Sequence, residues 1–242
     1  DELASNMAGE IEQAARRLRE REAEIIFRLA LAVEYRDNDT GDHTWRVARY
    51  SQIIAEAMGL EPDFCWQLYL AAPLHDVGKV AVPDAILLKK GRLDEAEFAV
   101  IRTHPIIGKR ILDGSKSKLI RMAAQIAESH HERWDGGGYP HGLAGLEIPL
   151  VARIVAVADV FDALTTARPY KEAMHFEAAF HCIMDERGRH FDPACVEAFA
   201  SAWEAIQAVP AAAGGERLAA LVRGIEPWAR VPAMPREVAE VA

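Results

Sequence analysis

The sequence predicts an all-α protein, and three observations lead to this class. Apolar residues recur at helical spacing in successive stretches, no run alternates with the period of two that a half-buried strand needs, and turn and capping residues separate the stretches. The 242 residues suffice for one large or two small domains, and 50% of them are hydrophobic, far from a disordered composition. We therefore expect a chain that folds around its own helical core.

The first predicted element is a long helix over residues 11–35. Its apolar residues recur every seven positions, at Ile11, Leu18, Ile25 and Ala32. This spacing, with flanks rich in Arg and Glu, is typical of a coiled-coil stripe, so one interpretation is a parallel dimerising helix that carries a signal. The other is an ordinary amphipathic helix packed on its own domain. We assign residues 1–36 to this element, and the start at Asp1 instead of Met indicates a piece of a longer chain.

The helical patterns that follow are separated by turn residues. They cover 43–58, 63–77, 95–104, 117–131, 150–166 and 193–207. Asp94 and Glu97 form a capping-box pattern before the third of these, and Asp192-Pro193 supplies an N-cap and a proline suited to a first helical turn. The glycine-rich stretch 133–148 is expected to be a structured loop. Residues 37–207 thus form the predicted globular domain. The Ala, Gly and Pro content after Ala208 predicts an appendage over 208–242, with one short helical pattern at 216–224.

The composition excludes several classes of protein. The three cysteines, Cys65, Cys182 and Cys195, are odd in number and widely spaced, which argues against a disulfide framework and favours a reducing cytoplasm. No stretch is apolar enough to span a bilayer, so we expect no membrane insertion. A net charge of −9 lacks the basic footprint of a protein that binds nucleic-acid polymers. An anionic substrate would therefore need local positive charge.

Histidines and aspartates gather at the ends of the predicted helices. They are His43, His75 with Asp76, His104, His130 with His131, and Asp159. A single histidine is more often a packing or capping residue than a ligand, but neighbouring helical positions point about 100° apart. An adjacent pair therefore cannot lie on one core face without burying a polar group at a cost, and metal coordination would remove that cost. Five His and two Asp without Cys favour Mn, Fe or Zn over Ca or Mg.

These residues belong to a longer series of motifs. The series is Tyr35-Arg36-Asp37, Thr40-Gly41-Asp42-His43, His75-Asp76-Val77-Gly78-Lys79, Asp84-Ala85-Ile86-Leu87-Leu88-Lys89, His104-Pro105, His130-His131-Glu132-Arg133-Trp134-Asp135-Gly136-Gly137-Gly138-Tyr139-Pro140, Ala156-Val157-Ala158-Asp159-Val160-Phe161-Asp162-Ala163-Leu164, Arg168-Pro169-Tyr170-Lys171 and His190-Phe191-Asp192-Pro193. Over about residues 24–207 the chain resembles the HD-GYP phosphodiesterases, a group within the HD-domain metal-dependent phosphohydrolases. The resemblance implies an HD-domain helical bundle with a long N-terminal helix and a Gly-Tyr-Pro loop, and a catalytic domain over 37–207.

The resemblance also implies a site for two divalent metal ions per chain. One would be held by His43, His75, Asp76 and Asp159, and the other by Asp76, His104, His130 and His131, with Asp76 as the bridge. Fe or Mn is the expected metal, with Zn, Ni and Mg as alternatives. A pair of metals lowers the pKa of a shared water, so that hydroxide bridging them attacks phosphorus in line. Family members with three metals carry Glu four residues before the first His, where this chain has Asp39, so we expect two metals.

Candidate substrate residues come from three motifs. Lys79 lies about one turn after His75-Asp76, within reach of a phosphate oxygen of the substrate. The resemblance assigns Arg168 and Lys171 to the phosphates or guanine of the substrate. Gly138 and Tyr139 of the Gly-Tyr-Pro loop are candidates for contact with substrate or with a partner domain, such as a diguanylate cyclase (GGDEF) domain.

Three carboxylates are candidates for roles beside the ligands. Asp162 follows Asp159 by about one turn, so it is a candidate either to orient a ligand or to pass a proton to the leaving 3′-oxygen. A capping or solvent-facing role fits the sequence equally well. Glu132 and Asp135 are expected to hydrogen-bond the ligating imidazoles, which fixes their tautomers. The remaining histidines, His141, His175, His181 and His190, fall outside the implied ligand set.

The activity that the resemblance implies is the hydrolysis of cyclic di-GMP by the output portion of a response regulator, with either pGpG or GMP as the end product. Two alternatives stay open. One is a catalytically weak cyclic dinucleotide receptor that signals through protein contacts, against which the complete ligand set argues. The other is an HD phosphohydrolase with another nucleotide substrate, against which the Gly-Tyr-Pro loop with Arg168 and Lys171 argues.

Overall fold

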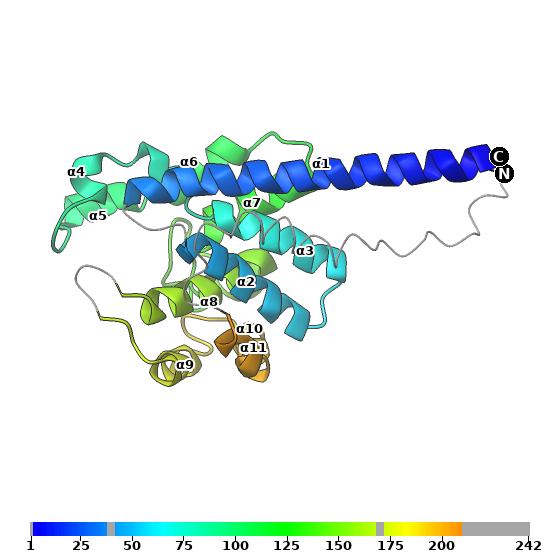
Figure 1. Ribbon diagram of the computed structural model, residues 1–242. Coiled ribbons are helices and arrows are strands. Elements are labelled where there is room, and N and C mark those ends of the chain that lie inside the picture. The colour runs from blue at the N-terminus through cyan, green and yellow to red at the C-terminus, as the bar shows by residue number, and fades with distance from the viewer. Residues whose placement is uncertain (1, 38–41, 168–171, 210–242) are drawn as a thin grey trace. The chain divides into compact units, whose positions relative to one another are not determined.

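The computed structural model describes residues 2–37, 42–167 and 172–209 (Figure 1). The described part of the chain consists of helices and connecting turns and contains no sheet; its isolated bridge joins Arg187 and Phe191. This confirms the predicted all-α class. No helix among these residues has the length and apolar character needed to cross a membrane. The helical pattern at 216–224 lies outside the described residues.

The N-terminal helix α1 (Glu2–Glu34) belongs to two compact units of the chain. Ile26–Ala212 form the larger unit, in which Ile26, Phe27 and Ala30 of α1 are buried and the ring of Phe27 lies 5.7 Å from that of Tyr69. The last turns of α1 thus pack within the larger unit, which begins at Ile26. A short 3₁₀ turn, η1 (Tyr35–Asp37), ends this element.

The two polar residues at the end of α1 contact the body. The Glu34 carboxylate is buried, and its Oε1 accepts a hydrogen bond from the backbone N–H of Thr44 at 3.2 Å. The Arg36 side chain donates to backbone carbonyls between residues 79 and 82. The end of α1 therefore contacts two segments that are more distant in the sequence.

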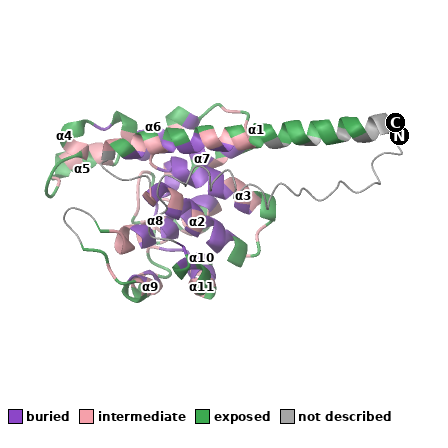
Figure 2. Ribbon diagram, in the orientation of Figure 1, coloured by how far each residue is buried: buried purple, intermediate pink, exposed green. Residues whose placement is uncertain are grey.

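The core of the larger unit lies where α2 (Asp42–Ala57) packs against α3 (Pro62–Ala71) and α8 (Leu150–Thr165), with α7 (Lys118–Ser129) and α10 (Pro193–Ser201) beside them. Figure 2 shows the buried residues concentrated on these helices. The apolar sequence of α8 buries Ile154, Val155 and Val157. The ring of Phe161, on the same helix, lies 5.2 Å from that of Tyr50 and 5.1 Å from that of Phe199.

The remaining elements are short. They are η2 (Ala72–Leu74), η3 (Val77–Ala81), α4 (Asp84–Leu87), α5 (Glu95–Ile101), α6 (His104–Leu112), η4 (Gly145–Glu147), α9 (Phe176–Asp185) and α11 (Trp203–Gln207). Asp94 and Glu97 form the predicted capping box, and the Asp192 side chain accepts from the N–H of Ala194 as the predicted N-cap. Residues 133–148 form a loop with one 3₁₀ turn, as predicted.

The helix expected over 193–207 divides at Ala202 into α10 and α11. Two further helix predictions were wrong at their ends. The helix expected over 63–77 stops at Ala71, and the chain continues through 3₁₀ turns on both sides of His75-Asp76. The helix expected over 95–104 ends at Ile101, and a separate helix begins at His104. These two corrections concern candidate ligands, because His75 and Asp76 lie between two 3₁₀ turns and His104 begins a helix.

Candidate metal centre

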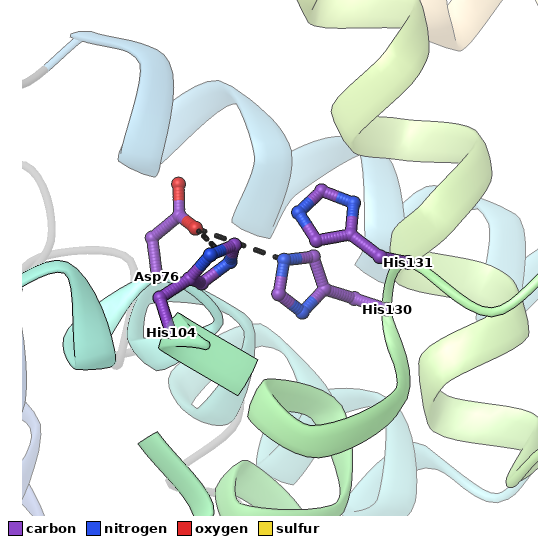
Figure 3. Close-up of side chains that lie close together, drawn as sticks. All are labelled: Asp76, His104, His130 and His131. Atoms are coloured by element: carbon purple, nitrogen blue, oxygen red, sulfur yellow. Dashed lines mark ion pairs between the residues drawn. The ribbon is translucent and has the colours of Figure 1, made fainter. Parts of the chain in front are cut away.

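Two overlapping groups of side chains converge in the larger unit. One group is Asp76, His104, His130 and His131, and the other is His43, His75 and Asp76; within each, the candidate ligand atoms lie within 4.8 Å of one another. Asp76 belongs to both groups. In Figure 3 its carboxylate points toward the rings of His104 and His130, with Oδ1 at 3.1 Å and 3.7 Å from their Nε2 atoms. Asp159 Oδ1 lies 3.5 Å from Nε2 of His43 and 4.0 Å from that of His75.

Five separate segments bring these side chains together. His43 stands in the first turn of α2, His104 at the start of α6, His130-His131 directly after α7, and Asp159 inside α8. His75 and Asp76 lie between η2 and η3, where Asp76 leaves helical geometry with φ −99° and ψ 10°. Because the backbone is not an α-helix at this point, two consecutive side chains turn toward one centre.

Two glycines allow the segments of the centre to approach closely. A Cβ atom on Gly78 would lie 1.9 Å from the carbonyl oxygen of His104, so η3 and the start of α6 touch backbone to backbone. A Cβ on Gly138 would lie 2.3 Å from the backbone nitrogen of Arg133 and 2.6 Å from the carbonyl oxygen of His131. Glycine is thus required for the Gly-Tyr-Pro loop to fold back on the histidine pair.

Backbone carbonyls orient most of the imidazoles. Nδ1 of His75 lies 2.9 Å from the Ala72 oxygen, Nδ1 of His104 lies 2.7 Å from the Ile101 oxygen, and Nδ1 of His130 lies 3.1 Å from the Ile126 oxygen. These contacts place a proton on Nδ1 of each ring and direct Nε2 toward the centre.

The expectation that Glu132 and Asp135 bind the imidazoles was wrong. The buried Glu132 carboxylate accepts from the N–H groups of His141 and Leu143, at 2.7 Å and 3.1 Å, and so braces the Gly-Tyr-Pro loop. Asp135 pairs with Arg133 and accepts from the N–H of Gly137. Both carboxylates thus bind groups of the loop over residues 133–148 instead of a ligating imidazole.

The hydrogen-bond partners of four atoms in the centre indicate whether the site fits a metal. Nε2 of His75, His104 and His130 and Oδ1 of Asp76 are buried without a hydrogen-bond partner. Leaving a buried polar atom unpaired costs about 1–3 kcal/mol each, and a divalent cation among them would satisfy all four. Imidazole nitrogen with carboxylate oxygen suits Mn, Fe, Zn or Ni. The residues present therefore fit a divalent metal site.

The charges of the site are compatible with metal binding. Burial opposes a negative charge on Asp76, but Lys79 and His75 outweigh it and hold the pKa of Asp76 well below its ordinary value. Burial and the neighbouring His130 hold the pKa of His131 well below its ordinary value, so this imidazole is neutral. Burial opposes a positive charge on His75, yet the Asp76 carboxylate prevails and raises the pKa of His75 to about 9. His75 must therefore lose a proton when it ligates a metal.

Asp162 lies behind His43, with its side chain buried. Its Oδ2 is 2.8 Å from Nδ1 of His43, and Arg46 donates to both of its oxygens, at 2.5 Å and 2.9 Å. Burial opposes ionisation of Asp162, but His43 and Arg46 outweigh burial and lower its pKa. This placement supports the ligand-orienting role over proton transfer to a leaving group. We did not predict Arg46, although its position one turn after His43 was a signal in the sequence.

The candidate substrate residues are partly described. Lys79 Nζ lies 2.8 Å from Asp76 Oδ2, although the α-helix on which the predicted one-turn spacing relied does not reach this residue. The Tyr139 ring stacks on His131 at 4.7 Å between centroids, and the Arg102 guanidinium lies 5.0 Å from the centroid of Tyr139. The sequence did not point to Arg102. Asp39, Arg168 and Lys171 lie outside the described residues.

The fold and the site together define a class of protein. It is a helical bundle in which one carboxylate, that of Asp76, belongs to two groups of histidines. The chain belongs to the HD-domain family: the family model described as HD domain matches residues 5–195. This confirms the predicted HD-domain bundle.

Curated proteins of the HD-GYP type are similar in sequence to this chain. The chain is 52% identical over 179 residues to the cyclic di-GMP phosphodiesterase response regulator RpfG of Xanthomonas campestris pv. campestris, covering 74% of this chain and 47% of that protein. It is 48% identical over 176 residues to a cyclic di-GMP phosphodiesterase of Thermotoga maritima, with coverages of 73% and 48%. It is 45% identical over 194 residues to the 3′3′-cGAMP-specific phosphodiesterase 2 of Vibrio cholerae, with coverages of 80% and 37%. The chain thus spans half or less of the length of these relatives.

Solved structures share the fold. The cyclic GMP-AMP specific phosphodiesterase V-cGAP3 of V. cholerae superposes with a TM-score of 0.56 at 20% identity, covering 90% of this chain and 55% of the other. Bd1817, an HDG"Y"P protein from Bdellovibrio bacteriovorus, gives a TM-score of 0.56 at 20% identity, covering 80% and 71%. At this identity the likeness concerns the fold alone.

Proposed function

We propose that this chain is the catalytic portion of a metal-dependent phosphodiesterase that hydrolyses cyclic di-GMP. The observation that carries the proposal is the set of buried, unpaired Nε2 and Oδ1 atoms around Asp76. Such a set is costly unless cations occupy it. The curated relatives named for cyclic di-GMP hydrolysis support the choice of substrate.

In this proposal the chain would hold two divalent cations, with Asp76 among the residues of both sites. His43, His75 and Asp159 complete one site, and His104, His130 and His131 complete the other. The donor set leaves Fe or Mn as the first choice, with Zn, Ni or Mg as alternatives. Bound cations would neutralise phosphodiester oxygens and lower the pKa of the attacking water.

The side chains around this centre bind and hold the substrate. Lys79 is held at Asp76 by the 2.8 Å ion pair, where its ammonium group can contact a phosphate oxygen. Arg168 and Lys171 remain the predicted contacts to the other phosphate or to guanine. Water adds across one P–O bond of the ring to give pGpG, and a second hydrolysis gives GMP. Local positive charge thus lets a chain of net charge −9 accept an anionic substrate.

A second substrate is supported by one comparison. Relatives that are 45% and 38% identical to this chain are named for 3′3′-cGAMP hydrolysis. Cyclic GMP-AMP differs from cyclic di-GMP in one base, and the metal centre contacts phosphates. Base recognition would therefore decide between the two, through residues away from the ligands.

The test is turnover of both dinucleotides by the purified chain loaded separately with Mn and Fe. Asp76→Ala should abolish turnover and lower metal content, whereas Asp113→Ala, which removes an exposed carboxylate, should leave both unchanged. If 3′3′-cGAMP is turned over faster than cyclic di-GMP, we would conclude that 3′3′-cGAMP is the substrate. Tight binding of a dinucleotide without any product would overturn the proposed hydrolysis in favour of a receptor.

We also propose that α1 pairs with α1 of a second copy. Ile11, Leu18 and Ile25 keep the seven-residue spacing and are exposed, at 67%, 69% and 58%. Pairing would bury this stripe. The matched variants Leu18→Glu and Arg19→Glu should differ, because the first alone places a charge in the stripe; sedimentation that shows a monomer for the unaltered chain would contradict the proposal.

The remaining expectations about context stay predictions. They are a cytoplasmic location, a receiver or sensor domain before α1, and a diguanylate cyclase domain that contacts the Gly-Tyr-Pro loop. The relative named as a response regulator supports the second, since this chain covers 47% of its length.

A further inference from the structure

Two motifs of the sequence have no role in the proposed function, and they meet in the structure. They are Tyr35-Arg36-Asp37, which follows α1, and the stretch that begins at Asp84 with α4. Arg36 Nη2 lies 2.6 Å from Asp84 Oδ1, although 48 residues separate the two in the sequence. Between them runs η3, the turn that begins directly after Asp76.

The Arg36 guanidinium also binds the backbone at the end of η3. Nη1 donates to the carbonyl oxygens of Lys79 and Val80, at 3.2 Å and 2.5 Å, and Nη2 donates to that of Val82 at 2.8 Å. Carbonyls at the end of a helix lack intrahelical partners, and the planar guanidinium offers donors in a fixed fork. One side chain thus binds three carbonyl oxygens at the end of η3.

This segment carries Lys79. At its start, Gly78 is pressed against the backbone of His104, where a Cβ atom would lie 1.9 Å from the carbonyl oxygen. At its end, Arg36 holds the carbonyls of residues 79, 80 and 82. Lys79 lies between these two points, with Nζ 2.8 Å from Asp76 Oδ2. The position of the ammonium group therefore depends on both ends of η3.

We propose that Arg36 is a positioning residue that acts through Lys79. By fixing the end of η3, Arg36 keeps the Lys79 ammonium at the metal centre, where it can bind a phosphate oxygen of the substrate. Asp84 holds the guanidinium in the orientation that serves the three carbonyls. This inference rests on the proposed function for the identity of the ligand, but the placement of η3 is independent of it.

The first expected effect is on substrate binding. Arg36→Ala removes the bonds that fix η3 without removing a metal ligand, so KM for cyclic di-GMP should rise about tenfold, as for the weakening of one charge-assisted hydrogen bond. The value of kcat and the metal content should change little, because the lost interaction serves ground state and transition state alike. Arg92→Ala, which removes another exposed arginine, is the control and should leave KM unchanged.

A double-mutant cycle tests whether Arg36 acts through Lys79. In the Lys79→Ala background, adding Arg36→Ala should raise KM less than twofold further, because the group that Arg36 positions is gone. The same tenfold increase in both backgrounds would overturn the proposal. Arg36→Lys retains the charge but not the fork, so it should behave like Arg36→Ala. Full recovery of KM by Arg36→Lys would show that charge alone matters and would also overturn it.

A measurement without turnover separates this inference from the proposed function. Amide hydrogen exchange over residues 77–84 should become faster in Arg36→Ala and, to a smaller degree, in Asp84→Asn, while exchange in α7 stays unchanged. Unchanged exchange over 77–84 overturns the inference whatever the enzyme does. If the unaltered chain neither binds nor hydrolyses a cyclic dinucleotide, the proposed function fails, and the exchange result alone decides whether Arg36 fixes η3.

Discussion

Replacement of Asp162 by Asn tests the role of the carboxylate behind His43. Asp162 is fully buried, its Oδ2 lies 2.8 Å from Nδ1 of His43, and Arg46 donates to both of its oxygens. The Asn variant keeps the shape of the side chain but removes the negative charge that Asp162 places against the buried Arg46 guanidinium. Removing one partner of a buried ion pair costs about 3–5 kcal/mol, and the retained amide oxygen places this case near 3 kcal/mol.

Two assays measure the effect. In urea denaturation of the metal-free protein, the Asp162→Asn variant should lose about 3 kcal/mol of unfolding free energy, or roughly 6–12 °C in melting temperature for a chain of this size. In competition with a chelator, its metal affinity should fall about 10–100-fold, because a neutral amide holds the His43 ring less firmly than the carboxylate does.

A double variant separates stability from ligand orientation. Arg46→Met combined with Asp162→Leu replaces the ion pair with apolar side chains and should regain much of the stability, whereas the metal affinity should stay low. Stability and metal affinity equal to those of the unaltered chain in Asp162→Asn would refute the reasoning. Turnover lost with both properties intact would instead restore Asp162 as a proton donor to the leaving group.

Further predictions concern backbone approach and pH. Gly78→Ala should lower metal content and destabilise the fold by more than about 3 kcal/mol, since its Cβ would meet the His104 carbonyl at 1.9 Å; Gly9→Ala, with nothing within 4 Å, should be neutral or stabilising in the same denaturation assay. Mn affinity, followed by calorimetry, should rise with pH up to about 9, where His75 loses its proton; a flat profile would contradict this assignment. Without metal, the stability that His75 gains from Asp76 should be full below about pH 6.5 and lost as pH passes 9, which denaturation across this range checks.

The sequence predicted the helical class and most helix positions, because periodicity and caps are local. Asp94 with Glu97 and Asp192 with Pro193 are short-range signals, and the structure confirms both. The helix expected through residue 77 failed because Pro73 in η2 has no backbone N–H with which to continue an α-helix, which is a local signal in the sequence. The structure adds a contact that the sequence did not indicate, between Gly78 of η3 and the start of α6. That contact joins segments far apart in the chain, so local patterns carry no trace of it.

In the candidate site, too, local patterns indicated some residues, whereas contacts between distant segments determine others. The pairs His75-Asp76 and His130-His131 stand out because adjacent polar residues conflict with burial on one helix face. Arg36 could not be assigned, because its partners lie 43 to 48 residues away and are mostly backbone carbonyls, which no side-chain pattern reveals. Asp162 was recognised as a candidate, but its choice between two roles depended on burial.

The contact between Glu34 and Thr44 has a consequence for where the catalytic domain starts. The first N–H groups of a helix need external acceptors, and in α2 the acceptor for Thr44 is the last residue of the preceding helix. A shortened protein that begins at residue 37 would therefore lose a cap on the very turn that presents His43. A shift of α1 by one helical turn, about 5.4 Å, would remove the same cap from the turn that carries the first candidate ligand.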